Sequence, residues 1–214
     1  MRARLFKGID QQTVVGILMV ILAGLVLSLA YSENHKIQTV HSSVPVLVLS
    51  GHPIRLSIVG AILPLLTVWA LIRKLNLCRI GYLFGVILAV NSSYLLSFVA
   101  YLPDGTLKIA TKAIPLVVTV SAVAFLSTLR SPTKALGLAY CLGVIASLVG
   151  CDILKFLPFV ASGNAFGHAV FIIGGYGCFD GVFMFGPLAM LLLICCIVCT
   201  NAYAIAHEYY DKRR

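Results

Sequence analysis

The fold class is decided by the stretch ALGLAYCLGVIASLVGCDIL, residues 135–154, in which Asp152 is the only charged residue. A helix of about 20 predominantly apolar residues crosses the roughly 30 Å hydrocarbon core of a bilayer. The few small polar residues of this stretch do not make the wetted stripe that a surface helix of a soluble protein carries. The stretch therefore predicts a transmembrane helix.

The rest of the chain follows the same pattern. Hydrophobic residues make up 60% of the 214 residues, charged residues make up 11%, and the mean hydropathy is +1.02. A soluble domain carries about 25% charged residues. We therefore expect an all-α polytopic membrane protein, with residues 1–214 forming one integral membrane domain of about six helices. The expected helices cover residues 13–31, 57–72, 80–101, 109–129, 135–154 and 182–206.

The first apolar run, Thr13–Tyr31, has two interpretations. Its basic start and the sequence Ser28-Leu29-Ala30 resemble a secretory signal peptide with a cleavage site. The run is longer than the apolar region of a signal peptide, which is about 7–15 residues. This length favours an uncleaved first helix.

The positions of the basic residues predict the orientation. With the N-terminus in the cytoplasm, 11 of the 16 Lys and Arg residues fall in cytoplasmic segments and 5 in external ones. This bias follows the positive-inside rule, so both termini are expected in the cytoplasm, in the cytoplasmic (plasma) membrane of a prokaryote. The short clusters also account for the net charge of +9. No nucleic-acid partner is expected. The lipid bilayer is the expected partner, with other membrane subunits or a homo-oligomer as further possibilities.

Two short external segments predict strands, Val44–Leu49 (VPVLVL) and Ala169–Ile173 (AVFII). Each is followed by glycine and then by a helix that contains proline, Pro64 or Pro187, which would kink the helix or open its hydrogen bonds. The repetition indicates a parallel duplication, although apolar segments also resemble one another by chance. If the repeat is real, the two strands could pair as an external cap.

A glycine-rich loop precedes the last helix and contains Gly174, Gly175, Gly177 and Gly181. Glycine permits positive φ and close approach of the backbone. Irregular backbone at membrane depth is tolerated where it is buried in protein or lines a cavity. The loop is therefore either re-entrant, forming part of a site, or a plain external turn.

The candidate catalytic residues are two aspartates near the external face, Asp152 and Asp180. An ionisable residue at membrane depth is costly and indicates a functional site. If the two carboxyl groups meet, they would share a proton and suit acid–base activation of water, proton-coupled transport or cation binding. Two structural alternatives compete with this. Asp180 could cap its helix, and Arg55 could neutralise either acid.

Histidines, cysteines and an asparagine give weaker signals. His35, His41, His52 and His168 lie on the expected external side, but their spacing matches no metal motif, and no cofactor is expected. Cys151 and Cys178 could form an external disulfide. Asn91, Ser92 and Ser93, near the bilayer midplane, are expected to hydrogen-bond between helices or to line a solute pathway.

The segments GCDIL and GGYGCFDGVF resemble the bacterial and archaeal membrane family catalogued as domain of unknown function 1614, and the resemblance covers about Leu56 to Leu193. It implies a multi-pass membrane protein with Asp152 and Asp180 as signature acids, and it implies no activity. A looser likeness is to GxGD-type intramembrane aspartyl proteases. Here Cys178 and Phe179 separate Gly177 from the aspartate, so the motif is stretched by two residues.

Three classes of function stay open at this point. The chain could be an accessory or assembly subunit whose acids are structural. It could be a di-aspartyl intramembrane hydrolase or protease. It could also be a proton- or cation-coupled transporter of small solutes, using the same acids with Arg55 and Asn91 in support.

Overall fold

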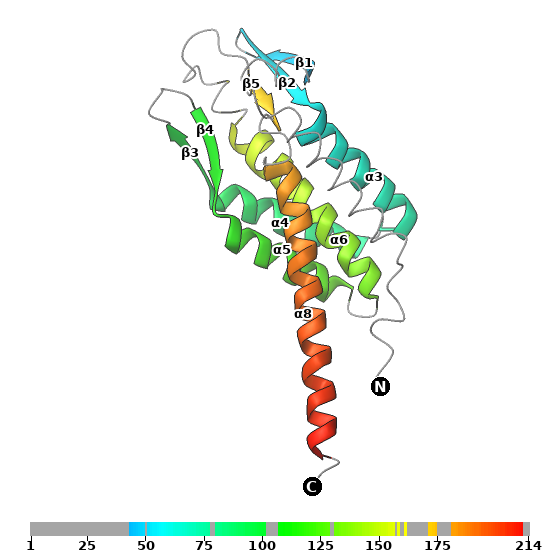
Figure 1. Ribbon diagram of the computed structural model, residues 1–214. Helices are drawn as coiled ribbons and strands as arrows, with labels where there is room; N and C mark the ends of the chain where they lie inside the picture. Colours follow the sequence, from blue (N-terminus) through cyan, green and yellow to red (C-terminus); the bar gives the residue numbers. More distant parts are fainter. Residues whose placement is uncertain are drawn as a thin grey trace, which may run out of the picture.

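The computed structural model is mostly helical, with short strands gathered at one end of a helical bundle (Figure 1). We call this end of the bundle the strand end. The residues that the structure describes are 43–49, 51–77, 80–101, 107–128, 131–156, 158, 161, 171–174 and 181–211. The expected first helix, residues 13–31, lies outside these ranges.

The described helices include two π-helical segments, named η, whose hydrogen bonds join residues five apart. In chain order the helices are η2 (Ile58–Ile62), α3 (Leu63–Leu75), α4 (Ile80–Leu96), α5 (Ala113–Ser127), α6 (Pro132–Ile145), η3 (Ala146–Phe156) and α8 (Gly181–Asp211). Among the described residues, three stretches are long and apolar enough to cross a membrane: Ile58–Leu75, Pro132–Lys155 and Gly181–Thr200. Helices α4 and α5 are shorter, so the membrane character is supported while the number of six spans and their orientation stay predictions.

The strands form two small sheets. Strands β1 (Ser43–Leu49) and β2 (His52–Ser57) make an antiparallel hairpin whose turn contains Gly51 at φ 82°. Strand β5 (Phe171–Ile173) pairs with β2 in parallel, so β2 lies between β1 and β5. The two segments in which the sequence predicts strands therefore share a sheet without pairing with each other.

The second sheet corrects two of the expected helices. The helix expected at residues 80–101 ends at Leu96 and continues as β3 (Ser97–Tyr101), and the helix expected at 109–129 begins only after β4 (Leu107–Thr111). These strands pair antiparallel along their whole length. The hydroxyl of Ser97 donates to the Ser93 carbonyl at 2.6 Å, where α4 ends. Both strands are apolar enough to extend a hydropathy run, which does not distinguish a helix from a buried strand.

The prolines have different effects in the two helices that contain them. Pro64 is the second residue of α3 and lies two residues after the end of η2. Because proline lacks an N–H and its ring clashes with the preceding turn, the irregular winding lies in the turn before it. Pro187 lies inside α8, which remains helical over 31 residues. At 1.5 Å per residue α8 is about 46 Å long, and it extends past the other helices at the end opposite the strands (Figure 1).

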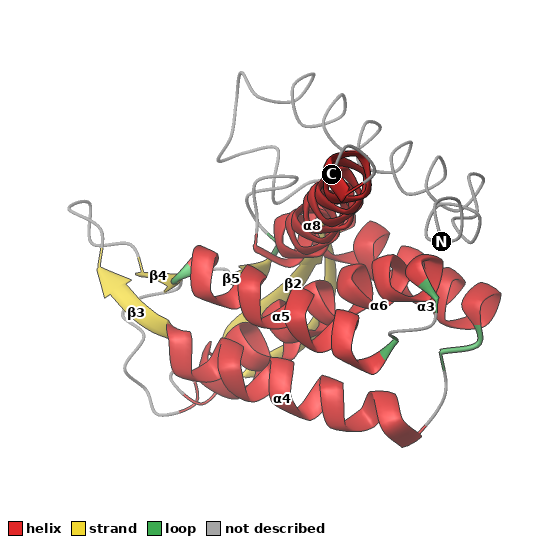
Figure 2. Ribbon diagram, turned by 90° about the horizontal axis from the view of Figure 1, so that it is seen from below, coloured by secondary structure: helices red, strands yellow, loops and turns green. Residues whose placement is uncertain are grey.

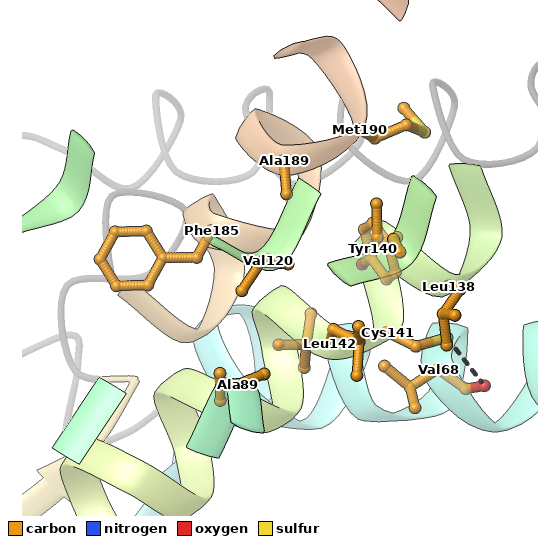
Figure 3. Packing of buried hydrophobic residues seen from close by; sticks show 14 of the residues in the cluster. Val68, Ala89, Val120, Leu138, Tyr140, Cys141, Leu142, Phe185, Ala189 and Met190 are labelled. Carbon is orange, nitrogen blue, oxygen red and sulfur yellow. Dashed lines mark hydrogen bonds between the residues drawn. The ribbon is translucent and has the colours of Figure 1, made fainter. Parts of the chain in front are cut away.

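The core is built around α6, where every residue from Ala135 to Val144 is buried. Seen along α8, helices α5 and α6 lie between α4 and α8 (Figure 2). Tyr140 and Leu142 of α6 meet apolar side chains of neighbouring helices, and the Cys141 thiol donates to the Val68 carbonyl at 3.9 Å (Figure 3). Helices α6 and α8 are in backbone contact at Gly143 and Gly186.

Candidate functional site

A buried polar cluster joins four elements at the strand end. It consists of Ser93 from α4, Ser97 from β3, Thr111 from β4 and Cys151 from η3. The Cys151 sulfur lies 3.0 Å from Ser93 Oγ, 2.8 Å from Ser97 Oγ and 3.1 Å from Thr111 Oγ1, and Ser97 Oγ lies 2.9 Å from Thr111 Oγ1. We call these four residues the Cys151 cluster. They tie the β3–β4 hairpin and η3 to the end of α4.

The hydrogens of the Cys151 cluster can all be placed. Ser97 donates its hydroxyl hydrogen to the Ser93 carbonyl, so its oxygen acts only as an acceptor within the cluster. The Cys151 thiol and the Thr111 hydroxyl then donate to Ser97 Oγ, and the Ser93 hydroxyl donates to the Cys151 sulfur, so the fourth contact, between Thr111 and Cys151, has no hydrogen of its own. Every donor finds an acceptor, as buried polar groups require. The cluster therefore has a structural role: its hydrogen bonds hold α4, β3, β4 and η3 together.

Asp152 directly follows Cys151 in the chain and is half-buried in η3. Gly150, on the other side of Cys151, sits against α4: a Cβ there would lie 2.6 Å from the Val90 carbonyl oxygen. The backbone on the N-terminal side of Asp152 is thus held by a glycine contact and by the Cys151 cluster. Segments of π-helix are frequent at functional sites, and this one carries an ionisable residue at the end of a predicted membrane span.

Beyond Asp152, a lysine marks the end of η3. Lys155 Nζ donates to the Tyr94 carbonyl at 3.1 Å and lies 4.8 Å from the centre of the Tyr94 ring. At the other end of the bundle, Arg73 lies over the ring of Trp69 at 4.6 Å. Amphipathic rings and snorkelling cations gather at membrane–water interfaces. The two pairs lie at opposite ends of the bundle, where the membrane–water interfaces are expected.

Arg55, a predicted support residue, lies in β2 and holds the neighbouring strand. Its Nε donates to Ser43 Oγ at 2.8 Å and its Nη2 donates to the Ser43 carbonyl at 2.7 Å. These two bonds join the guanidinium to the first residue of β1. The fork geometry of arginine suits such a double contact, and lysine cannot reproduce it.

We expect Arg55→Lys to lower the melting temperature of the detergent-solubilised protein more than Ser43→Ala does. A hydrogen bond to a charged group is worth about 1.5–3 kcal/mol, and less here because Arg55 is only half-buried. Ser43→Ala removes one of the two bonds, while Arg55→Lys breaks the fork. Thermal unfolding of both variants measures the difference, and equal melting temperatures would contradict this role of the guanidinium.

Two of the glycines selected from the sequence make close contacts. Gly174 has φ 73°, and a Cβ there would lie 2.6 Å from the Gly60 carbonyl carbon, so β5 ends in direct contact with η2. Gly181 begins α8, and a Cβ there would lie 3.0 Å from Ser147 Oγ of η3. The start of α8 and the start of η3 are therefore adjacent.

The other predicted residues are distributed as follows. Asn91 is exposed and donates to the Ile87 carbonyl of its own helix at 3.0 Å, so it neither bonds to a neighbouring helix nor reaches the Cys151 cluster. Cys151 is a free thiol, which excludes the alternative disulfide with Cys178. Only the backbone of His52 is described, in β2. The remaining candidates lie outside the described residues: Asp180, Gly175, Gly177, His35, His41 and His168.

Sequence reasoning predicted that Ser93 bonds to a neighbouring helix, as it does to Cys151, but it missed the Cys151 cluster as a whole. Its members are uncharged and lie at positions 93, 97, 111 and 151. The available signal was the pair Ser93 and Ser97, spaced four apart at the end of an apolar run. Nothing in the sequence connects that pair to Cys151.

The described residues contain no group of three or more His, Cys, Asp or Glu side chains able to hold a metal ion. A family model with the description "Protein of unknown function (DUF1614)" matches residues 13–192. The chain belongs to the DUF1614 family. The match includes the Cys151 cluster and Asp152, and it confirms the resemblance inferred from the glycine–aspartate segments. No curated protein and no solved structure matches this DUF1614 chain.

Proposed function

We propose that this membrane protein is a hydrolase in which Asp152 and Asp180 form an acid pair at the strand end. The observation that carries the proposal is the contact between Gly181 and Ser147. Asp152 follows Ser147 by five residues, about one turn of a π-helix, and so projects from nearly the same side of η3. Asp180 is covalently joined to Gly181, with Cα atoms about 3.8 Å apart. This arrangement supports an approach of the two carboxyl groups.

The chemistry of such a pair is acid–base activation of water. Two adjacent carboxylates repel each other and hold one proton between them. The ionised carboxylate takes a proton from water as the water oxygen bonds to the substrate carbonyl carbon, and the protonated carboxyl gives its proton to the carbonyl oxygen. When the tetrahedral intermediate collapses, the carbon–nitrogen bond breaks, the leaving amine takes up the proton of the pair, and a hydroxyl of the intermediate returns its proton to the pair as the carbonyl re-forms. The substrate class we propose is a membrane-borne peptide, in keeping with the looser likeness to GxGD-type proteases.

A transport function has less support. The described helices are closely packed, with backbone contact between α6 and α8 at Gly143. Polar side chains in α4 and α5, such as those of Asn91 and Thr119, bond to carbonyls of their own helices. These contacts supply no continuous polar path through the described helices. If the following test finds no shared proton, the acids are structural, as expected of an accessory subunit.

We expect infrared difference spectra of the detergent-solubilised protein to contain the carbonyl stretch of a protonated carboxyl that persists to neutral pH. Asp152→Asn and Asp180→Asn should each remove this band, because either change leaves a single carboxyl group with no second carboxylate to share its proton. Asp211→Asn, at the far end of α8, is the matched control and should leave the band in place. If the band is absent from the wild type, or survives both substitutions, the acid pair is refuted.

Hydrolysis is tested separately, by comparing protein N-termini in membranes from cells that express the wild type or Asp152→Asn. General acid–base groups contribute about 10²–10⁴-fold to rate, so peptides generated by the wild type should disappear in the variant. The variant must retain the wild-type melting temperature for the comparison to count. Identical sets of N-termini, with the shared proton present, would exclude peptide hydrolysis and leave a non-hydrolytic acid pair.

A further inference from the structure

Strand β1 exposes apolar side chains on both of its faces. The exposed fractions are 45% for Val44, 54% for Val46, 43% for Leu47 and 69% for Val48. Successive residues of a strand point to opposite sides, so residues 44–48 are packed against the protein on neither face, while Ser43 is buried and Leu49 packs against the core. No charged residue lies in β1. An apolar ribbon of this kind is unfavourable in water and marks a contact surface.

The edge of β1 is poorly suited to accept a strand from another protein. Pro45 has no N–H to donate, which interrupts any added ladder of hydrogen bonds. The register between β1 and β2 also shifts between Pro45 and Leu47, so that Val46 is an extra residue in the strand. Proline and bulges are the features by which edge strands avoid pairing. A strand of another protein is therefore a poor partner for this surface, and an apolar phase such as lipid is a better one.

The apolar surface of β1 continues a surface that already faces the expected bilayer. Ser43 pairs with Ser57, the residue immediately before the span Ile58–Leu75. Ile58 at the start of this span is 48% exposed, and Trp69 near its other end is 57% exposed. An exposed apolar band thus runs along the span and on to the first residues of β1, at the same end of the bundle as Lys155 and Tyr94.

From these observations we infer that β1 lies in the lipid interface and anchors the strand end to the bilayer surface through Val46, Leu47 and Val48. The partner is the boundary between headgroups and acyl chains, which accepts apolar side chains together with flanking cations. Arg55 supplies such a cation, because its bonds to Ser43 place the guanidinium at the base of the ribbon. Failure of the acid pair would leave this inference untouched, since no step of it involves Asp152.

The chain contains one tryptophan, Trp69, which permits a direct test in the full-length protein. The variant Val48→Trp in a Trp69→Phe background places the only tryptophan on β1, at the most exposed of its positions. It is reconstituted in vesicles of phosphatidylcholine and phosphatidylglycerol that contain lipids brominated near the headgroup. Val46→Trp in the same background is the second variant, and the unaltered protein with Trp69 is the reference for an interfacial tryptophan.

We expect brominated lipid to quench both new tryptophans to an extent comparable with Trp69, and their emission maxima to be shifted to the blue of free tryptophanamide in the same vesicles. Quenching by aqueous iodide without quenching by brominated lipid would overturn the inference, because the strand would then project into water. Protection from both quenchers would also overturn it, because protein would then cover the strand.

Discussion

Gly143→Ala is expected to lower the melting temperature of the detergent-solubilised protein sharply. The added Cβ would lie 2.5 Å from the Phe185 carbonyl oxygen and 2.6 Å from the Gly186 nitrogen. Both are backbone atoms of α8, so no side chain can rotate away and the two helices must separate. Overpacking costs about 1–3 kcal/mol and occasionally more. For a chain of this size, 3 kcal/mol corresponds to a shift of roughly 6–12 °C.

Helix α6 offers a matched control in Gly137. A Cβ on Gly137 would meet Cδ1 of Leu75, the far end of a flexible side chain. Alanine also favours a helix over glycine by about 1 kcal/mol. Gly137→Ala should therefore change the melting temperature little, in either direction. If the two variants melt at the same temperature, the backbone contact between α6 and α8 does not limit stability.

Gly150→Ala is expected to expose Cys151 to thiol reagents. The new Cβ would lie 2.6 Å from the Val90 carbonyl oxygen and 2.7 Å from Ser93 Cβ. Helix α4 and segment η3 must then move apart, which breaks the contact between Ser93 and Cys151. Cys151 is only 3% exposed in the native protein, so its labelling depends on local opening. A destabilisation of 1.4 kcal/mol in that opening raises the labelling rate about tenfold.

Maleimide labelling in vesicles, followed by mass spectrometry of the Cys151 peptide, measures this rate without removal of other cysteines. Gly85→Ala is the control on α4, because its Cβ would meet the Cγ1 atom of Val123 at 3.1 Å, a side-chain contact remote from Cys151. It should leave Cys151 protected. Unchanged labelling in Gly150→Ala would show that η3 is not held in place through this glycine.

The comparison of sequence and structure is informative at β3 and β4. Residues 80–101 look like one membrane helix because hydropathy reports the solvent around a segment and not its hydrogen-bond partner. The change from helix to strand at Ser97 depends on pairing with residues 107–111, and pairing between segments is a tertiary property. The same reason explains why β2, with its arginine and proline, was not recognised as the strand between β1 and β5.

The candidate site, too, was predicted from the sequence only in part. Asp152 stood out because an acid in an apolar run is costly wherever the helix packs, and its position near the end of an apolar helix follows from the sequence alone, whereas the π-helical segment η3 was not predicted. The prediction that Asn91 hydrogen-bonds between helices was wrong, because Asn91 lies on the exposed side of α4 and bonds within its own helix. Which side of a helix faces its neighbours cannot be derived from a run that is apolar all round.

The sequence by itself determined that this is a membrane protein of the DUF1614 family with acids near one end of its apolar helices. Those properties depend on local composition and on short motifs. Only the tertiary structure decided that Cys151 joins three hydroxyl side chains from three other elements, and that Gly181 begins α8 beside Ser147. The physical reason is that hydrogen bonds and glycine contacts act over about 3 Å between residues far apart in the chain, and no local pattern records which distant segment supplies the partner.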